Sequence, residues 1–312
     1  MVIQLSRNGR IWSDEDILAD CTEATRLFRI RRLDESLEDY VSEFTSAETA
    51  AASLIDRLPE LLRRPVDQEL LGSIVGNPML FTALRYLTAP PVSEDDLRTL
   101  LSGRVSRKAI RGSRELAEQL QFLLHQTLDP KRFSWILENQ TATPEQRRTA
   151  VIATAVAMTA QRVQANRRSE EKKDLESAVE DLLKALDYQR VPTPREPIES
   201  AEDLPQAGFY MTNATLGHDN GDCVIGLRNR KRLVLECKSS NSGINSRKRL
   251  NKEVVKDAEN WRSQFGNQVM TGAVLRGVFN PRYVSNAQET PLLIFWAHRL
   301  EDLREFITKE NS

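Results

Sequence analysis

Cysteine is scarce in this sequence of 312 residues, and its scarcity limits the chemistry that the chain can use. The three cysteines, Cys21, Cys223 and Cys237, do not have the spacing of a metal-binding cysteine motif. Three cysteines in a chain of this length also do not form the framework of a small disulfide-stapled secreted domain. We therefore expect a reduced, cytoplasmic environment.

Long apolar runs and an excess of one charge are missing too. No stretch reaches the roughly 20 apolar residues of a membrane-spanning helix, and the longest, residues 150–160, predicts a buried helix. We expect no signal peptide and no membrane partner. With 44 Lys and Arg against 45 Asp and Glu, the net charge is −1, so the global charge does not by itself indicate nucleic acid.

The length predicts two domains. Residues 1–165 predict an all-helical domain, with a capping pattern at Ser93 and Pro144 at the first position of a helix through Val163. Residues 166–312 alternate helical and strand patterns and predict an α+β or α/β domain, a mixed β-sheet flanked by helices. For the helical domain we expect dimerisation or DNA clamping.

A β-hairpin is the most informative feature. A tight turn centred on Asn229 would place Asp222 opposite Glu236 and Val224 opposite Val234. Because side chains alternate along a strand, six apolar residues then share the opposite face. These six are Cys223, Ile225, Leu227, Leu233, Leu235 and Cys237. This register gathers Asp222, Glu236 and Lys238 on one face, and a slip by one residue would reverse it.

Two carboxylates directly opposite each other repel and need a compensating cation. A hard divalent ion with oxygen ligands, Mg²⁺ above all, fits such a pair, and we expect Mn²⁺ to substitute. The predicted ligands are the Asp222 and Glu236 carboxylates and the backbone carbonyl of Cys237, which lies between the two functional side chains. Lys238 is placed to orient or help deprotonate the attacking water.

An acid, a short hairpin and then Glu-x-Lys resemble the motif of the PD-(D/E)XK nuclease superfamily, although the leading Pro is replaced by Gly221. Residues 170–173 contain two further Glu-x-Lys-like matches, which we set aside because they lie in a polar helical stretch without strand context. In the superfamily's first helix, a Glu six residues before a Leu-Leu pair approaches the metal. That resemblance makes Glu176 a further catalytic candidate, with Glu180 as the alternative. Either could instead be a solvent-facing acid.

Several longer segments resemble the XamI family of type II restriction endonucleases: residues 236–251, 83–87, 90–97, 129–135 and 295–298. The resemblance implies a Mg²⁺-dependent endonuclease that cuts both strands of a short palindromic site in double-stranded DNA. It also implies a separate methyltransferase that protects the same site, and a location in a cytoplasm of the bacterial type. Because the symmetry of a palindrome mirrors that of the protein, we expect a homodimer.

The residues that follow Lys238, together with the basic segment around the hairpin, predict contacts with DNA. Residues 228–256 hold ten Lys or Arg and two acids, a local charge of +8 that suits a phosphate backbone. Arg fits guanine edges and Asn fits adenine, while other residues would contact phosphates. The predicted DNA-binding residues are Ser239, Ser240, Asn241, Asn245, Ser246, Arg247, Lys248, Arg249 and Lys252.

Two other functions remain open from the sequence. The same core could belong to a repair or methylation-dependent nuclease, which would not cut unmethylated DNA into discrete fragments. A DNA-binding protein without catalysis is the third possibility, and it predicts that Glu236→Ala changes no activity. The complete set of Asp222, Glu236 and Lys238 argues against the third.

Overall fold

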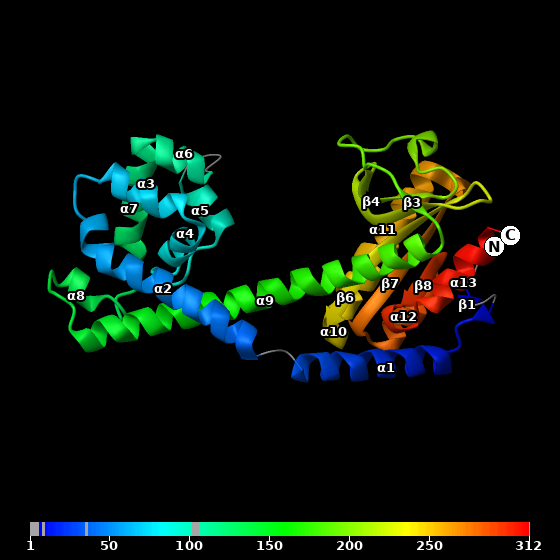
Figure 1. Ribbon diagram of the computed structural model, residues 1–312, viewed down its shortest axis with the longest axis horizontal. Coiled ribbons are helices and arrows are strands. Elements are labelled where there is room, and N and C mark those ends of the chain that lie inside the picture. Colours follow the sequence, from blue (N-terminus) through cyan, green and yellow to red (C-terminus); the bar gives the residue numbers. More distant parts are fainter. Residues whose placement is uncertain (1–5, 8–9, 35–36, 102–105, 312) are drawn as a thin grey trace. The chain divides into compact units, whose positions relative to one another are not determined.

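The computed structural model describes residues 6–7, 10–34, 37–101 and 106–311, and it divides into two units. Unit 1 comprises Met1–Glu35 and Arg167–Ser312, and unit 2 comprises Ser36–Asn166 (Figure 1). The first helix therefore belongs with the C-terminal sheet, although its sequence falls in the predicted helical domain. The division at residue 166 lies next to the predicted boundary.

Unit 2 is helical and packs around one apolar core. The predicted capping pattern is present, since the Ser93 hydroxyl accepts a hydrogen bond from Asp96 N at 3.0 Å. Pro59 lies inside a helix, near its C-terminal end. The helices are α2 (Leu37–Leu61), α3 (Gln68–Gly76), α4 (Pro78–Arg85), α5 (Glu94–Leu100), α6 (Arg107–Gly112), α7 (Arg114–Thr127), α8 (Ser134–Leu137) and the first part of α9 (Pro144–Ala185).

Helix α9 is one uninterrupted helix of 42 residues. It begins at Pro144, as predicted, but it does not end at Val163, and the predicted catalytic helix is its continuation. Between Glu145 and Ala185 there is no Gly or Pro, and the charged residues at 167–173 are good helix formers. The prediction of two separate helices was wrong for that reason.

A six-stranded mixed sheet forms the centre of unit 1, in the order β3-β4-β5-β6-β7-β8. Strands β4, β5 and β6 are antiparallel, whereas β6, β7 and β8 are parallel and β3 is parallel to β4. The strands are β3 (Gln189–Arg190), β4 (Phe209–Leu216), β5 (Asp219–Gly226), β6 (Arg232–Asn241), β7 (Val269–Val278) and β8 (Leu292–Trp296). Separately, β1 (Ser6–Arg7) pairs with β2 (Arg10–Ile11).

The predicted hairpin register is confirmed. Strands β5 and β6 pair Val224 with Val234 and Gly226 with Arg232. All six apolar residues predicted for one face are buried in a single cluster. The turn between the strands is closed by a hydrogen bond from Leu227 N to Lys231 O, with Arg230 at φ 67°.

Helices cover both faces of the sheet. The C-terminal part of α9 and α13 (Glu301–Glu310) pack on the face of Cys223 and Cys237. The other face packs against α1 (Asp14–Leu33), α11 (Val255–Phe265) and α12 (Pro281–Gln288). Between β6 and α11 the chain forms α10 (Gly243–Arg247) and a π-helical segment, η2 (Lys248–Val254). Short 3₁₀ turns are η1 (Ala201–Asp203), η3 (Gly266–Gln268) and η4 (Ala297–Arg299).

The sequence also predicts strands at 269–279 and 292–297 and a short helix at 300–307, and β7, β8 and α13 confirm them within a few residues, whereas β4 and α12 were not predicted. A Ser/Asn-rich loop predicted at residues 239–246 is shorter than expected, because β6 extends to Asn241 and α10 begins at Gly243. None of the described helices combines the length and apolar character that crossing a membrane would require.

Candidate active site

Asp222 lies on β5, where the pairing of β5 with β6 ends at Cys223 and Leu235. Its side chain is 6% exposed, and its Oδ2 accepts a hydrogen bond from the backbone N–H of Cys237 at 2.7 Å. A Cβ at Gly221 would lie 2.8 Å from Cγ1 of Val234. A larger residue at 221, including the Pro of the superfamily motif, would require Val234 to move.

Glu236 and Lys238 extend from β6 on the same face as Asp222. The Lys238 Nζ lies 2.8 Å from Oε2 of Glu236, and the Glu236 side chain is only 3% exposed. Burial and the neighbouring Asp222 carboxylate raise the pKa of Glu236 to about 8, although Lys238 acts in the opposite direction. Burial lowers the pKa of Lys238, but the Glu236 carboxylate more than offsets this, so the net shift is upward and Lys238 remains an ammonium.

Glu176, on α9, is brought to the same place through a lysine. The Lys172 Nζ lies 3.0 Å from Oδ1 of Asp222 and 3.2 Å from Oε1 of Glu176. Burial and the Asp222 charge raise the pKa of Glu176. Glu180 points elsewhere, since its carboxylate accepts a hydrogen bond from the Tyr210 hydroxyl and pairs with Arg190. The geometry thus places Glu176, and not Glu180, beside Asp222.

Lys172 is the residue of this site that the sequence analysis missed. Its Glu-x-Lys context was set aside for lack of a strand, and that part of the reasoning holds, because Lys172 lies on α9. The available signal was its position four residues before Glu176, a spacing that pairs side chains on one helix face. Nothing in the local sequence indicated that its ammonium also contacts Asp222.

The donor set suits a hard cation. Three carboxylates, those of Asp222, Glu236 and Glu176, lie near one another, and two of them are almost fully buried. Within the described ranges, no three acidic, His or Cys side chains are arranged as a ready-made metal site, and the Lys172 ammonium takes the position between Asp222 and Glu176. Burial and, after it, the Asp222 charge raise the pKa of Glu236, and a bound cation would favour the charged form of this carboxylate.

The predicted DNA-binding residues divide by burial. Asn241, Asn245, Arg247, Lys248 and Lys252 are exposed, and Ser239 and Arg249 are partly buried, with an Arg249 guanidinium N–H donating to the Ser239 carbonyl.

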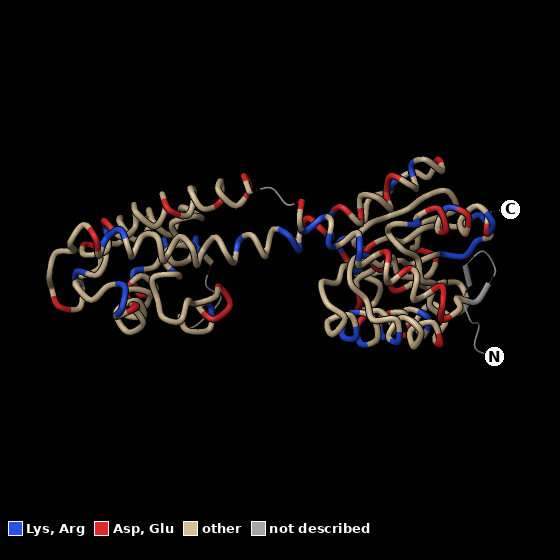
Figure 2. Tube along the Cα trace, turned by 90° about the horizontal axis from the view of Figure 1, so that it is seen from below, with Lys and Arg blue, Asp and Glu red and all other residues tan. Residues whose placement is uncertain are grey.

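Ser240 and Ser246 differ from that prediction, because both are buried. The Ser240 hydroxyl donates to Ser242 O, while Ser246 Oγ donates to Gly243 O and accepts from Asn280 N. These two serines hold the chain after β6 in place and are not presented to a ligand. In Figure 2, Lys and Arg are mixed with Asp and Glu in both units, in agreement with the balanced net charge.

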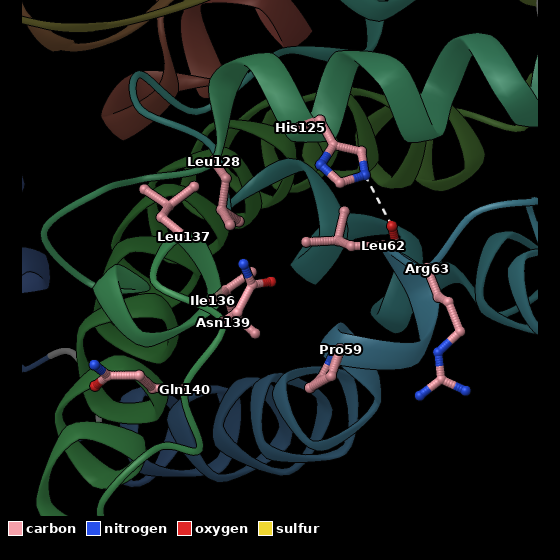
Figure 3. Close-up of a pocket in the computed structure, with 9 residues that line it drawn as sticks. All are labelled: Pro59, Leu62, Arg63, His125, Leu128, Ile136, Leu137, Asn139 and Gln140. Atoms are coloured by element: carbon pink, nitrogen blue, oxygen red, sulfur yellow. Dashed lines mark hydrogen bonds between the residues drawn. The ribbon is translucent and has the colours of Figure 1, made fainter.

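A separate pocket of about 500 Å³ lies within unit 2 (Figure 3). His125 borders it, and its Nε2 lies 2.8 Å from the Leu62 carbonyl oxygen. Arg63, Asn139 and Gln140 supply the other polar groups, and no Asp or Glu lines the pocket. It therefore lacks the carboxylates that metal-assisted hydrolysis needs.

Sequence comparisons agree with the geometry of the carboxylate site. The family described as XamI restriction endonuclease matches residues 64–296. The type II restriction enzyme XamI of Xanthomonas campestris pv. amaranthicola is 29% identical, over 87% of this chain and 97% of the relative. The type II restriction enzyme SalI of Streptomyces albus G is 24% identical, over 94% of this chain and 96% of the relative.

One solved structure, protein VC1899 from Vibrio cholerae, matches over 85% of this chain with a TM-score of 0.28 and 15% identity. This chain spans 57% of the length of VC1899, and at that TM-score we infer nothing from the likeness. The family match covers most of the chain and includes Asp222, Glu236 and Lys238. With its restriction-endonuclease-like sheet and this match, the chain belongs to the XamI restriction endonuclease family.

Proposed function

We propose that this chain is a Mg²⁺-dependent type II restriction endonuclease that hydrolyses phosphodiester bonds in both strands of a short palindromic DNA site. The observation that carries the proposal is the arrangement of Asp222, Glu236 and Lys238 at the end of the β5–β6 pairing. The backbone N–H of Cys237 fixes Asp222 beside Glu236, so the two carboxylates share one local site although they come from different strands.

The proposed metal ligands are the carboxylates of Asp222 and Glu236 and the backbone carbonyl of Cys237, with Glu176 close by. A divalent ion, Mg²⁺ or Mn²⁺ as its substitute, would supply Lewis-acid charge and acidify a water molecule when bound there. The backbone of Cys237 suits the role of a metal ligand because its N–H already binds Asp222 and its neighbour in sequence is Glu236. Its thiol does not interfere, because it is buried on the opposite face of the sheet.

Lys238 is proposed to orient the attacking water and to offset negative charge on the phosphate in the transition state. Its raised pKa supports an electrostatic role, because a lysine that stays protonated is a poor base. Hydrolysis forms a bond between the water oxygen and phosphorus and breaks a bridging P–O bond, and the leaving oxygen takes up a proton. The Lys238 side chain is 21% exposed, so a phosphate can reach it where the β5–β6 pairing ends.

DNA recognition is proposed for the exposed polar residues that follow β6. Asn241, Asn245, Arg247, Lys248 and Lys252 are available for base edges and phosphates. We further propose a homodimer on palindromic DNA, a separate methyltransferase that protects the same site, and a cytoplasmic location. A dimerising or DNA-clamping role for the helical unit is part of the same proposal.

Digestion of unmethylated phage DNA with Mg²⁺ tests the function, with wild type beside Lys238→Ala. Discrete fragments from wild type alone are expected, and sequencing of the fragment ends would give the site and the stagger of the cut. Intact DNA with both proteins, despite DNA binding, would contradict the proposal and favour a modification-dependent nuclease or a binder without catalysis. Methylated DNA would then be the next substrate.

A further inference from the structure

A second polar cavity lies within unit 1, between α1, α9 and β7. Its volume is about 340 Å³. Apolar side chains from α1 and α9 form much of its wall, and two arginines, Arg31 of α1 and Arg276 of β7, line it together with Asp174 of α9. None of these charged residues takes part in the carboxylate site described above.

The two guanidinium groups are partly buried and incompletely compensated. The Arg31 and Arg276 side chains are 29% and 24% exposed. Both groups line the same cavity, and burial together with the positive charge of Arg276 lowers the pKa of Arg31. The Nε of Arg31 is buried and has no hydrogen-bond acceptor among the residues that the structure describes.

The acids near these arginines form long or shared contacts. Glu171 lies 2.9 Å from Arg32 but 3.5 Å from Arg31. Asp174 is 63% exposed and stays 3.8 Å from Arg276.

An arginine that is fully paired with an acid has different contacts in this chain. Arg147 makes two hydrogen bonds to the Asp56 carboxylate at 2.6 and 2.7 Å. Arg31 and Arg276 have only longer contacts with the nearby acids, at 3.5 and 3.8 Å, so their guanidinium groups can bind another anion.

The cavity lies close to the catalytic strand. In the parallel pairing of β6 and β7, Lys238 is opposite Leu275 and Ser239 is opposite Arg276. Arg276 is therefore one step beyond Lys238 along the sheet, and alternation directs its side chain to the other face. Gly277 keeps the strands close at this point, because a Cβ there would lie 2.2 Å from Ser240 O.

We propose that this cavity binds one backbone phosphate of the DNA, held between the guanidinium groups of Arg31 and Arg276. A phosphodiester carries one negative charge and two unbridged oxygens, which suit paired guanidinium forks. The inference rests on the proposed function, since it takes DNA as the substrate. It also assigns a role to α1, which lies outside the matched residues 64–296.

The test is the salt dependence of binding to a short DNA duplex of arbitrary sequence, without divalent ions so that no cleavage occurs. Wild type is compared with Arg31→Gln/Arg276→Gln and with Arg304→Gln as a control. Arg304 is an arginine of the same unit, 35% exposed and paired with Glu301. Loss of one phosphate contact should reduce the log–log salt slope by about 0.9 in the double variant only. A slope equal to that of Arg304→Gln would overturn the proposal.

Asp174→Asn provides a second test that does not remove a buried group. Freed from Asp174, Arg276 should bind phosphate more strongly, so DNA affinity should rise by about 2- to 5-fold. The control is Asp181→Asn, which removes an exposed acid of the same helix that pairs with Lys184. Equal effects of the two substitutions would contradict a local phosphate site.

Failure of this inference and failure of the proposed function give different results. A wild type that neither binds nor cuts DNA would contradict the function itself. A wild type that cuts DNA, with the double variant behaving like Arg304→Gln, would contradict the phosphate cavity alone. Inorganic phosphate that raises the melting temperature of wild type but not of the double variant, with unchanged salt slopes for DNA, would show a site for free phosphate and overturn the assignment to DNA.

Discussion

Two carboxylates of the sheet unit, Asp20 and Glu236, are almost completely buried, but their surroundings differ in charge. Asp20 of α1 lies 3.1 Å from Arg299 and 3.3 Å from His298, so basic groups surround it. Glu236 has one contacting cation, Lys238, and shares its site with the Asp222 carboxylate.

The comparison separates a carboxylate in a structural contact from one in the candidate active site. The polar contacts of Asp20, both made by its Oδ1, hold α1 against the segment after β8, whereas its Oδ2 is buried without a hydrogen-bond partner among the described residues. Glu236 shares its buried site with the Asp222 carboxylate, and burial together with that charge raises the pKa of Glu236. Unbalanced burial of like charges is costly to folding and is kept where it serves a reaction.

The largest expected effect is on cleavage. Glu236→Gln keeps the shape of the side chain but removes a charge that would hold the metal, so we expect activity to fall by about 10³-fold or more. Cleavage of phage DNA with Mg²⁺ measures it, and thermal unfolding verifies that the variant is folded. Glu259→Gln, an exposed glutamate of the same unit, should cut like wild type. If Glu236→Gln cleaves DNA as fast as wild type, Glu236 does not act in the reaction.

Asp20→Asn should change stability instead. It removes the carboxylate charge beside His298 and leaves Arg299 with the longer 3.5 Å contact to Asp302, so we expect the free energy of unfolding to fall by about 3 kcal/mol. Urea denaturation measures this, and the folded fraction should keep its cleavage activity. The control is Glu23→Gln, which removes an exposed ion pair with Arg26 on the same helix and should not measurably change the free energy of unfolding. Loss of cleavage at full stability would show that Asp20 acts in the reaction.

The pH dependence of the metal-free protein should report the charge excess directly. The folded protein holds the Glu236 proton up to about pH 8, whereas the unfolded chain releases it near its ordinary pKa of 4.5. Between these values the unfolded state binds fewer protons, so stability falls as pH rises, by on the order of 2 kcal/mol. Asp222 and Lys238 are the charged groups that face Glu236 in this titration.

Melting temperatures at about pH 5 and about pH 8 would measure this decline. The decline should be shallower in Glu236→Gln and in wild type with Mg²⁺, because each removes or offsets the buried charge. Parallel curves for wild type and Glu236→Gln would mean that another group governs the pH dependence.

The smallest expected effect concerns Lys172. Its ammonium contacts Asp222 and Glu176 and would compete with a metal for both carboxylates. Lys172→Gln should therefore strengthen Mn²⁺ binding by about 3- to 10-fold, a modest change because the side chain is half exposed. Titration calorimetry without DNA measures it. Lys173→Gln, with the same change of charge at an exposed neighbour, should bind Mn²⁺ like wild type.

The register of the two strands that carry the candidate site could be predicted because its determinants are local. Strand alternation and one tight turn fix the register of β5 and β6, whose pairing ends at Cys223 and Leu235, next to Asp222 and Glu236. The resemblance to the superfamily's first helix offered Glu176, with Glu180 as the alternative, and only the packing of α9 against the sheet shows which of the two lies beside Asp222.

The parts that were missed depend on contacts between distant segments. Nothing in residues 14–33 shows that α1 packs on the sheet, since that contact depends on apolar side chains of β7 and α12. The continuity of α9 could have been predicted from its lack of Gly and Pro, but the change from apolar to charged composition suggested a boundary. The burial of Ser240 and Ser246 depends on Asn280 and on the early start of α10.

Cys237 lies between Glu236 and Lys238 yet directs its thiol into the core on the opposite face, and Cys21 and Cys223 are buried as well. Burial raises the pKa of the Cys237 thiol far above its usual range, so the reactive thiolate is scarce while the sheet is closed. An alkylating reagent would therefore modify the catalytic strand only at the rate at which β6 separates from its neighbours. Alkylation of Cys237, followed by mass spectrometry, would thus measure how often the strands that carry the candidate site separate.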